Sequence, residues 1–342
     1  MNDNYLRMIR GEAVDHTPCW FMRQAGRSQA KYREIKKNYS LFEITHIPEL
    51  CAYVTALPVE EYGVDAAILY KDIMTPLPAI GVEVEIRGGI GPVIEKPIRT
   101  MDDIDRMRPL DVDGELSFMT ETIRILTKEM LQVPLIGFAG APFTLASYMI
   151  EGGPSKTYNG TRIMMLQSPG LWEALMTKLT DMTSVYLKAQ VAAGANALQL
   201  FDSWVGAVSP EQYRLFIAPY VKRILTEVKE EYPDIPITMH AVGAMHILPE
   251  WEQLPLDVIG LDWRTPIPMA THMGITKAVQ GNLDPAYLFA DWDILRFKID
   301  RILEEGATYG RHIFNLGHGV LPEVNPDVLK RVVEYVHERT NK

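Results

Sequence analysis

Cysteine is scarce in this chain, which has 342 residues but only Cys19 and Cys51. Two thiols cannot form a disulfide framework, and the sequence has neither a C-x-x-C motif nor a Cys/His spacing typical of a metal site. We therefore expect both cysteines to be small buried hydrophobic side chains in a reducing compartment. No metal-binding residues are predicted.

Long hydrophobic runs and an excess of positive charge are missing as well. No stretch approaches the roughly 18 uncharged apolar residues that span a membrane, and the N-terminal segment has no apolar core of signal-peptide length. The 34 Lys and Arg residues are outnumbered by 44 Asp and Glu residues, which gives a net charge of −10. These features predict a cytoplasmic protein without a membrane or nucleic-acid partner. An anionic ligand is still compatible with this charge, because a local group of arginines can set the field in a cleft.

Apolar residues, in contrast, make up 47% of the chain. Short apolar runs bounded by turn residues alternate with amphipathic stretches, as in a parallel sheet buried on both faces. Eight alternations of strand and helix predict a single (β/α)8 TIM barrel over residues 1–342, with an open doubly wound sheet as the alternative. The predicted strands are Cys19–Met22, Ala66–Tyr70, Leu135–Phe138, Ala197–Phe201, Ile237–His240, Val258–Leu261, Lys277–Gln280 and His312–Asn315.

Turn and capping residues place the other elements. Between strands two and three, Val82–Arg87 and Ile90–Glu95 flank a Gly-Gly pair and predict a small β-hairpin inserted into the barrel. Pro219 should kink the helix that contains it, and Gly306 should end another. The predicted helices are Ser117–Leu131, Pro169–Ala193, Ser209–Tyr232, Trp292–Glu305 and a last one that opens at Asn325-Pro326.

Polar residues follow almost every predicted strand, and in this fold the carboxyl ends of the strands build the site. Arg23 and Arg27 follow the first strand and would share a face if the turn between them were helical. Guanidinium groups bind carboxylates through two parallel hydrogen bonds, so the pair indicates an anionic ligand. The alternative is that both arginines form structural ion pairs.

Three further side chains are candidates for the same site. Asp72 ends the second strand, where a carboxylate could bind metal, act as a base or balance a cationic intermediate, or else pair with one of the arginines. Tyr148 offers a phenol, although packing alone would also explain it. His318 stands between two glycines after the last strand, which favours ligand contact and structural roles about equally.

Other catalytic patterns are weak or absent. His240, Asp202 and Ser203 could be combined into a triad, but the sequence has no G-x-S-x-G elbow. Neither of the glycine-rich phosphate-binding loops is present, so no nucleotide cofactor is predicted.

Several segments resemble the uroporphyrinogen decarboxylase family, in the same order and over essentially the whole chain. The first is the most specific. The segments are Pro18–Arg27 (PCWFMRQAGR), Gly137–Leu145 (GFAGAPFTL) followed by Tyr148 and Glu151-Gly152-Gly153, Gly260–Trp263 (GLDW), Gln280–Pro285 (QGNLDP) and Asn315–Gly319 (NLGHG).

This resemblance implies a (β/α)8 barrel, a homodimer, and catalysis without a metal or an organic cofactor. It implies removal of CO2 from the four acetate side chains of uroporphyrinogen III, which gives coproporphyrinogen III for haem synthesis. Arg23 and Arg27 would bind substrate carboxylates, and Asp72 would hydrogen-bond the pyrrole NH groups. The implied catalytic residues are Arg23, Arg27, Asp72 and Tyr148, and the implied substrate contacts are Arg23, Gln24, Arg27, Asp72, Tyr148, Phe201, Ser203 and His318.

The chain departs from the family pattern at Ser28, where many members have tyrosine, and in the unusual loop Met239–Gly243. A second family with the same fold, the cobalamin-dependent methyltransferases, holds zinc with a His-x-Cys pair and a later cysteine. His240 has Val242 in place of that first cysteine, and no later cysteine follows, so this alternative is disfavoured. A non-catalytic tetrapyrrole-binding protein is the remaining alternative.

Overall fold

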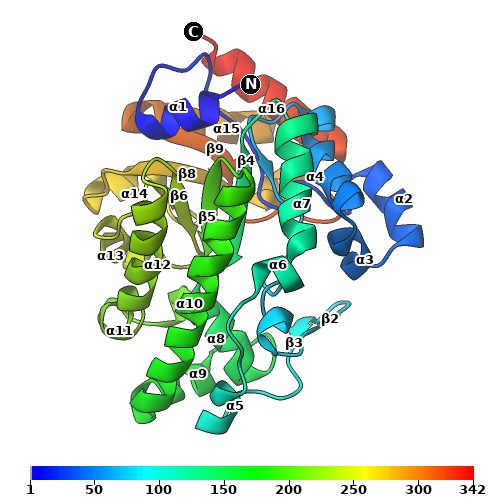
Figure 1. Cartoon of the computed structure of the whole chain (residues 1–342). Helices are drawn as coiled ribbons and strands as arrows, with labels where there is room; N and C mark the ends of the chain where they lie inside the picture. Colours follow the sequence, from blue (N-terminus) through cyan, green and yellow to red (C-terminus); the bar gives the residue numbers. More distant parts are fainter. Residues whose placement is uncertain (1) are drawn as a thin grey trace.

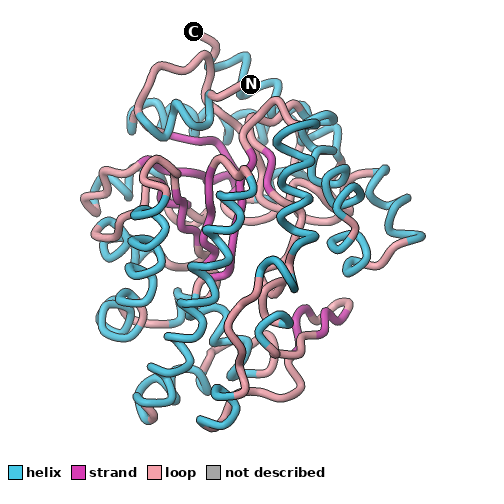
Figure 2. The backbone as a smooth tube through the Cα atoms, in the orientation of Figure 1, coloured by secondary structure: helices cyan, strands magenta, loops and turns pink. Residues whose placement is uncertain are grey.

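The computed structural model, which describes residues 2–342, contains one parallel sheet of seven strands in the order β1-β4-β5-β6-β7-β8-β9. Helices surround these strands (Figure 2), whose residues are almost all buried. The strands are β1 (Ala67–Ile68), β4 (Leu135–Gly140), β5 (Ala197–Phe201), β6 (Ile237–His240), β7 (Val258–Gly260), β8 (Ala278–Leu283) and β9 (His312–Leu316). The predicted barrel architecture is confirmed, with seven regular strands instead of eight.

The predicted first strand, Cys19–Met22, is wrong as a regular strand, since only Cys19 forms a bridge, with Phe314 of β9. Side chains replace the ladder here, because the backbone NH groups of Cys19, Phe21 and Met22 donate to Asp65, Gln24 and Asn315, respectively. The segment nevertheless closes the barrel. Phe314 N donates to Pro18 O at 2.9 Å, and Asp65 N donates to Cys19 O at 2.8 Å, just before β1.

The hairpin insertion is confirmed as β2 (Glu85–Arg87) and β3 (Gly91–Val93), which pair antiparallel. It lies on the side of the molecule away from both termini, as do α8 and α9 (Figure 1), and Ile94 N, just after β3, donates to Gly152 O at the end of α8. Since α8 follows directly from β4, the carboxyl ends of the strands face this same side.

Two helix predictions needed correction. The segment Ser209–Tyr232 is broken into two helices at Ile217 instead of kinked, because Pro219 lacks an NH and its ring excludes the carbonyl four residues earlier. The helix from Trp292 does not end at Gly306 but continues to Tyr309. Gly306 is a packing position and not a helix end, because a side chain there would collide with the ring of His312.

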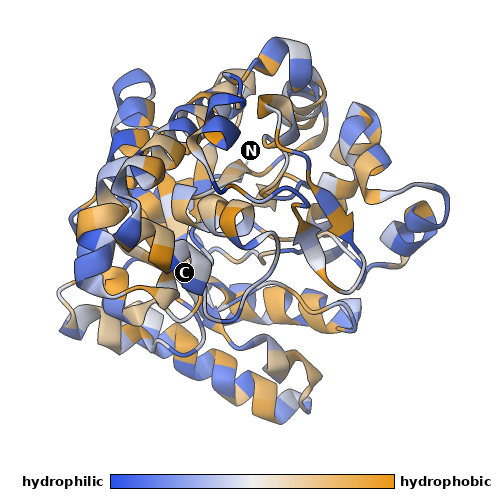
Figure 3. Cartoon of the chain, turned by 90° about the horizontal axis from the view of Figure 1, so that it is seen from below, coloured by the Kyte–Doolittle hydropathy of each residue, from blue (hydrophilic) through white to orange (hydrophobic). Residues whose placement is uncertain are grey.

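The remaining bounds agree closely with expectation, including a helix over Pro169–Ala193. Figure 3 shows these helices around the centre of the chain, with hydrophobic and hydrophilic residues on each. The helices are α1 (Asn4–Arg10), α2 (Ala30–Asn38), α3 (Leu41–His46), α4 (Pro48–Tyr62), α5 (Met101–Asp105), α6 (Val112–Glu115), α7 (Ser117–Ile125, continued by a π-helical turn over Leu126–Met130), α8 (Pro142–Glu151), α9 (Asn159–Gln167), α10 (Pro169–Ala193), α11 (Pro210–Phe216), α12 (Ala218–Glu231), α13 (Leu248–Glu252), α14 (Ile267–His272), α15 (Trp292–Tyr309) and α16 (Pro326–Thr340). None of the helices over residues 2–342 is long and apolar enough to cross a membrane.

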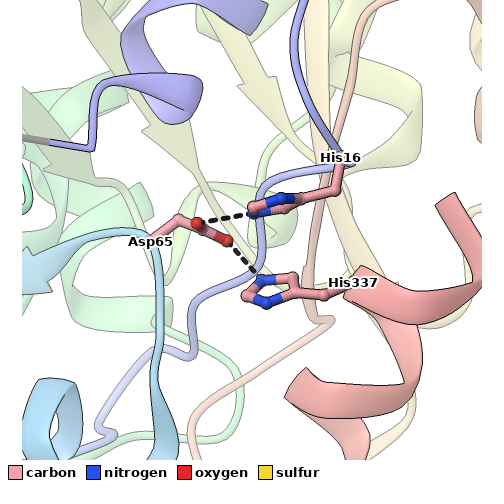
Figure 4. A group of neighbouring side chains, drawn as sticks. All are labelled: His16, Asp65 and His337. Carbon is pink, nitrogen blue, oxygen red and sulfur yellow. Dashed lines mark hydrogen bonds and ion pairs between the residues drawn. The ribbon is translucent and has the colours of Figure 1, made fainter. Parts of the chain in front are cut away.

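At the opposite end of the barrel, the Asp65 carboxylate joins the N-terminal segment to α16 (Figure 4). His16 Nε2 donates to Oδ1 at 2.9 Å and His337 Nε2 donates to Oδ2 at 2.7 Å. The backbone NH of Cys19 and the side-chain amide of Asn2 donate to the same carboxylate. Because an ionised carboxylate only accepts, both imidazoles direct protons at it, not metal-binding lone pairs. We therefore describe His16, Asp65 and His337 as a structural lock.

Candidate functional site

The loop after the barrel-closing segment carries Arg23, Gln24 and Arg27. It consists of turns, so the two arginines do not share a helical face. Gln24 is fully buried, where its Oε1 accepts from Phe21 N and its Nε2 donates to Ala66 O, both at 3.0 Å. With both ends of its amide bonded to backbone, Gln24 ties this loop to the strand that leads into β1.

Arg23 and Arg27 are exposed, and no salt bridge to either is formed by any carboxylate in residues 2–342. The structural ion pairs considered as an alternative are therefore not present. Arg23 adopts a left-handed backbone conformation, with φ 57°, and its side chain lies across Gly319. Its charge acts on both His318 and Tyr148, whereas Arg27 acts on Tyr32. The guanidinium groups are thus available to an anionic ligand.

Asp72 lies four residues after β1 and also lacks a salt bridge within the described chain. Burial raises the pKa of its carboxyl group, against the hydrogen bond from Met74 N and the charge of Lys71. The Lys71 ammonium points elsewhere, donating to Thr45 O over the ring of Phe118. A carboxylate that is poorly hydrated and has no ion-paired cation is suited to bind a cation or NH groups of a ligand.

Tyr148 is almost completely buried in the last turn of α8. Its ring packs edge-on against Trp204, with 5.9 Å between ring centroids. Burial raises the pKa of the phenol, while Trp204 and Arg23 oppose that rise. The phenol therefore stays protonated at neutral pH and can donate a hydrogen bond.

His318 follows β9, near Trp263 and within reach of the charge of Arg23. Burial first, and then the charges of Arg23 and Arg264, lower the pKa of His318 to about 4 against the opposing charge of Asp262. The imidazole is therefore neutral at pH 7. Neutral imidazole beside an arginine can hydrogen-bond a carboxylate while adding no charge of its own.

Phe201 and Ser203 are placed by the carboxyl end of β5, and both are partly exposed. The Phe201 ring packs edge-on against Phe138 and His240, with centroid separations of 5.5 and 6.2 Å. Ser203 makes no side-chain hydrogen bond to residues 2–342. It is thus available to a ligand.

The triad of His240, Asp202 and Ser203 does not form. Asp202 Oδ1 accepts from Thr144 Oγ1 at 2.8 Å, and the side chain of His240 has no hydrogen-bond partner of normal geometry in residues 2–342. His240 also lies outside the one group of potential metal ligands found there, which is the structural lock. Sequence reasoning did not single out Thr144, whose hydroxyl donates to Asp202, because Thr144 lies within α8 and not after a strand end.

Unpaired positive charge at the carboxyl ends of a closed parallel barrel defines a barrel protein that binds an anionic small molecule at its mouth. Comparisons with known proteins identify which group of barrels this is. A profile of the family described as Uroporphyrinogen decarboxylase (URO-D) matches residues 1–339. The uroporphyrinogen decarboxylase of Geobacillus thermodenitrificans is 60% identical over 341 residues, covering 100% of this chain and 98% of that protein. The uroporphyrinogen decarboxylase of Bacillus cereus (strain B4264) is 58% identical over 338 residues, covering 99% of this chain and 97% of that protein. The chain belongs to the uroporphyrinogen decarboxylase family.

Solved structures with the same fold are more distant in sequence. A methyltransferase from Methanosarcina mazei aligns with a TM-score of 0.75 at 18% identity and covers 98% of each chain. A B12-independent methionine synthase from Shewanella sp. W3-18-1 aligns with a TM-score of 0.57 at 13% identity, covering 89% of this chain and 91% of that one. At these identities the likeness concerns the fold alone.

Proposed function

We propose that this chain decarboxylates the four acetate side chains of uroporphyrinogen III to give coproporphyrinogen III. The observation that carries the proposal is the Asp72 carboxylate, which is largely buried at the mouth without an ion-paired cation. Family membership over the whole chain supports the choice of substrate. Residues 1–342 would act as one domain, in the cytoplasm and as a homodimer, as the family resemblance implies.

The reaction needs an electron sink before a pyrrole acetate can lose CO2. Protonation of the pyrrole ring supplies one, because the cationic ring takes up the electrons of the breaking C–C bond. A second proton then converts the resulting exocyclic methylene to a methyl group, and the ring loses its first proton. The net reaction consumes one proton and releases one CO2 for each acetate. The substrate itself carries the electrons, so we propose that no metal or organic cofactor takes part.

Asp72 would accept hydrogen bonds from the pyrrole NH groups and stabilise the ring cation in each round. Its raised pKa reflects poor hydration, which makes its interaction with a cation stronger than in water. Arg23 and Arg27 would hold substrate carboxylates, with Tyr148, Ser203 and neutral His318 as further hydrogen-bonding groups and Phe201 as an apolar contact. Gln24 would act through the loop, since its amide is already bonded to backbone.

The test is incubation of the purified chain with uroporphyrinogen I and III under anaerobic conditions, with detection of CO2 and of the porphyrinogen products. We expect stepwise loss of four carboxyl groups. Asp72→Asn should abolish turnover with an unchanged fold, while the exposed Asp293→Asn serves as the matched control. Absence of CO2 from the unmodified chain would refute the proposed function. Near-normal turnover by Asp72→Asn would refute only the role of that carboxylate.

A further inference from the structure

A buried carboxyl group, Asp202, joins two elements of the site that are separate in sequence. Thr144 Oγ1 on α8 donates to Asp202 Oδ1 at 2.8 Å, and Trp204 N donates to the same Thr144 oxygen at 3.3 Å. Thr144 lies one helical turn before Tyr148, so the two side chains share a face of α8. The contact between Asp202 and Thr144 therefore fixes α8, with its phenol, against the β5 loop that carries Ser203 and Trp204.

The surroundings of Asp202 contain no charge that would favour an ionised carboxylate. Its side chain is 0% exposed and forms no salt bridge among residues 2–342. Oδ2 has no hydrogen-bond partner there, and neither does the hydroxyl of the adjacent Tyr213 on α11. An ionised carboxylate with donors from Thr144 alone and no cation would be disfavoured in such a place, whereas a neutral acid is tolerated.

The titratable groups around Asp202 agree with a neutral acid. On β6, burial lowers the pKa of His240 to about 3, so that imidazole is uncharged. On α13, Glu250 is ion-paired with Arg214. Burial is the main cause that raises the pKa of the Tyr213 phenol, and Asp202 and Glu250 raise it further. On α8, Tyr148 is a neutral phenol. Burial raises the pKa of Asp202 itself to about 7, against the hydrogen bonds from Thr144.

We propose that Asp202, as a neutral carboxylic acid, and Thr144 form a clamp that positions Tyr148 relative to Ser203 for the proposed decarboxylation. Both are positioning residues, because neither needs to contact the substrate. Ionisation of Asp202 would strengthen the hydrogen bonds from Thr144 but would leave a buried charge without a cation, and entry of water to hydrate that charge would separate α8 from the β5 loop. The activity should therefore decline as pH rises through neutrality, in addition to any titration of the substrate.

The clamp is tested first by Asp202→Asn, which keeps the acceptor oxygen for Thr144 but cannot ionise. At pH 6 this variant should keep kcat/KM within about threefold of the unmodified chain, and its alkaline decline should disappear. Thr144→Val, which removes the hydroxyl at similar volume, should lower kcat/KM about tenfold or more, and Thr144→Ser should restore it. An unchanged alkaline decline in Asp202→Asn, or normal kinetics in a folded Thr144→Val, overturns the clamp.

A measurement without substrate separates the clamp from the proposed function. The infrared band of a protonated carboxyl group should be present in the unmodified chain at pH 6, titrate near neutral pH and be missing from Asp202→Asn. As pH rises from about 4 to about 7, the melting temperature of Asp202→Asn should rise relative to the unmodified chain and then level off. A carboxyl group whose pKa is raised to about 7 on folding makes the stability of the unmodified chain fall between its unfolded pKa and its folded pKa. A missing band at pH 6 overturns the neutral acid even if decarboxylation is observed, and a band in a chain without decarboxylase activity refutes only the proposed function.

Discussion

The position of the Arg23 side chain can be tested by a substitution at a neighbouring glycine. A Cβ atom at Gly319 would lie 2.8 Å from Arg23 Cγ and 3.1 Å from Arg23 Nε, too close for the present rotamer. Alanine fits the backbone of residue 319, because this glycine is not among those with positive φ. Gly319→Ala should therefore displace a flexible, exposed side chain without unfolding the barrel.

The expected loss of activity follows from the hydrogen bonds that Arg23 would donate to the substrate. One hydrogen bond to a charged group contributes about 1.5–3 kcal/mol, which corresponds to roughly a 10- to 100-fold loss of kcat/KM. Arg23→Lys should have a loss of similar size, because an ammonium cannot reproduce the paired hydrogen bonds of a guanidinium. Since Arg23 forms no ion pair within the described chain, both variants should keep nearly the melting temperature of the unmodified chain.

The assay is steady-state decarboxylation together with thermal unfolding of the same preparations. Gly170→Ala is the matched control, because a Cβ at Gly170 meets no atom within 4 Å. A large fall in melting temperature with normal kinetics of the folded fraction would mean that Arg23 is structural. Normal kinetics of Gly319→Ala beside impaired Arg23→Lys would show that the packing of Arg23 on Gly319 does not orient the guanidinium.

Four further outcomes are expected. Arg27→Lys should lower kcat/KM by roughly 10- to 100-fold for the same reason as Arg23→Lys, measured by the same assay. Activity should survive exhaustive chelation; loss to a chelator and recovery with zinc would contradict the cofactor-free mechanism. Asp65→Asn should lower the free energy of unfolding by about 3–5 kcal/mol in urea titrations, because two imidazoles lose a buried ionised partner; a loss below about 1 kcal/mol would contradict the structural lock. The hydrogen bond with Asp65 raises the pKa of His16. Burial acts to raise the pKa of Asp65, but the hydrogen bonds from His16 and His337 hold that pKa well below its usual range. The lock should therefore stabilise most between about pH 4 and 6.5, with stability falling at lower pH through Asp65 and at higher pH through His16, as the free energy of unfolding measured across pH will show.

The parts of the fold that were predicted correctly have local causes. Residues 169–193 form a helix as expected because Pro169 opens the helix and Gly194, with φ 124°, follows its last residue. The hairpin follows from its Gly-Gly turn. The errors lie where residues distant in sequence determine the local structure. The backbone NH groups of Cys19–Met22 bond side chains instead of a neighbouring strand, and one of these side chains, Asn315, is 293 residues away from Met22.

The candidate site residues stay a prediction, but their placement at the ends of the strands has a local cause as well. A barrel collects the residues after its strands at one mouth, so Arg23, Asp72, Ser203 and His318 could be grouped from sequence alone. The inward direction of the Gln24 side chain could not be predicted, because it depends on a hydrogen bond to Ala66 O, which is 42 residues away in sequence. The contact between Thr144 and Asp202 was equally hidden, since these residues are 58 positions apart and only packing of α8 on β5 brings them together.

Closure of the barrel through Pro18–Trp20 has a consequence for synthesis on the ribosome. This early segment needs Phe314 on β9 as its neighbour, and Asp65 needs His337, which is 272 residues away. The barrel-closing segment thus emerges long before β9, and until then the edge of β1 that it covers is open to pairing with other chains. The contacts of Asp65 with α16 can form only after the final helix has been synthesised, so we expect closure of the barrel to be among the last steps of folding.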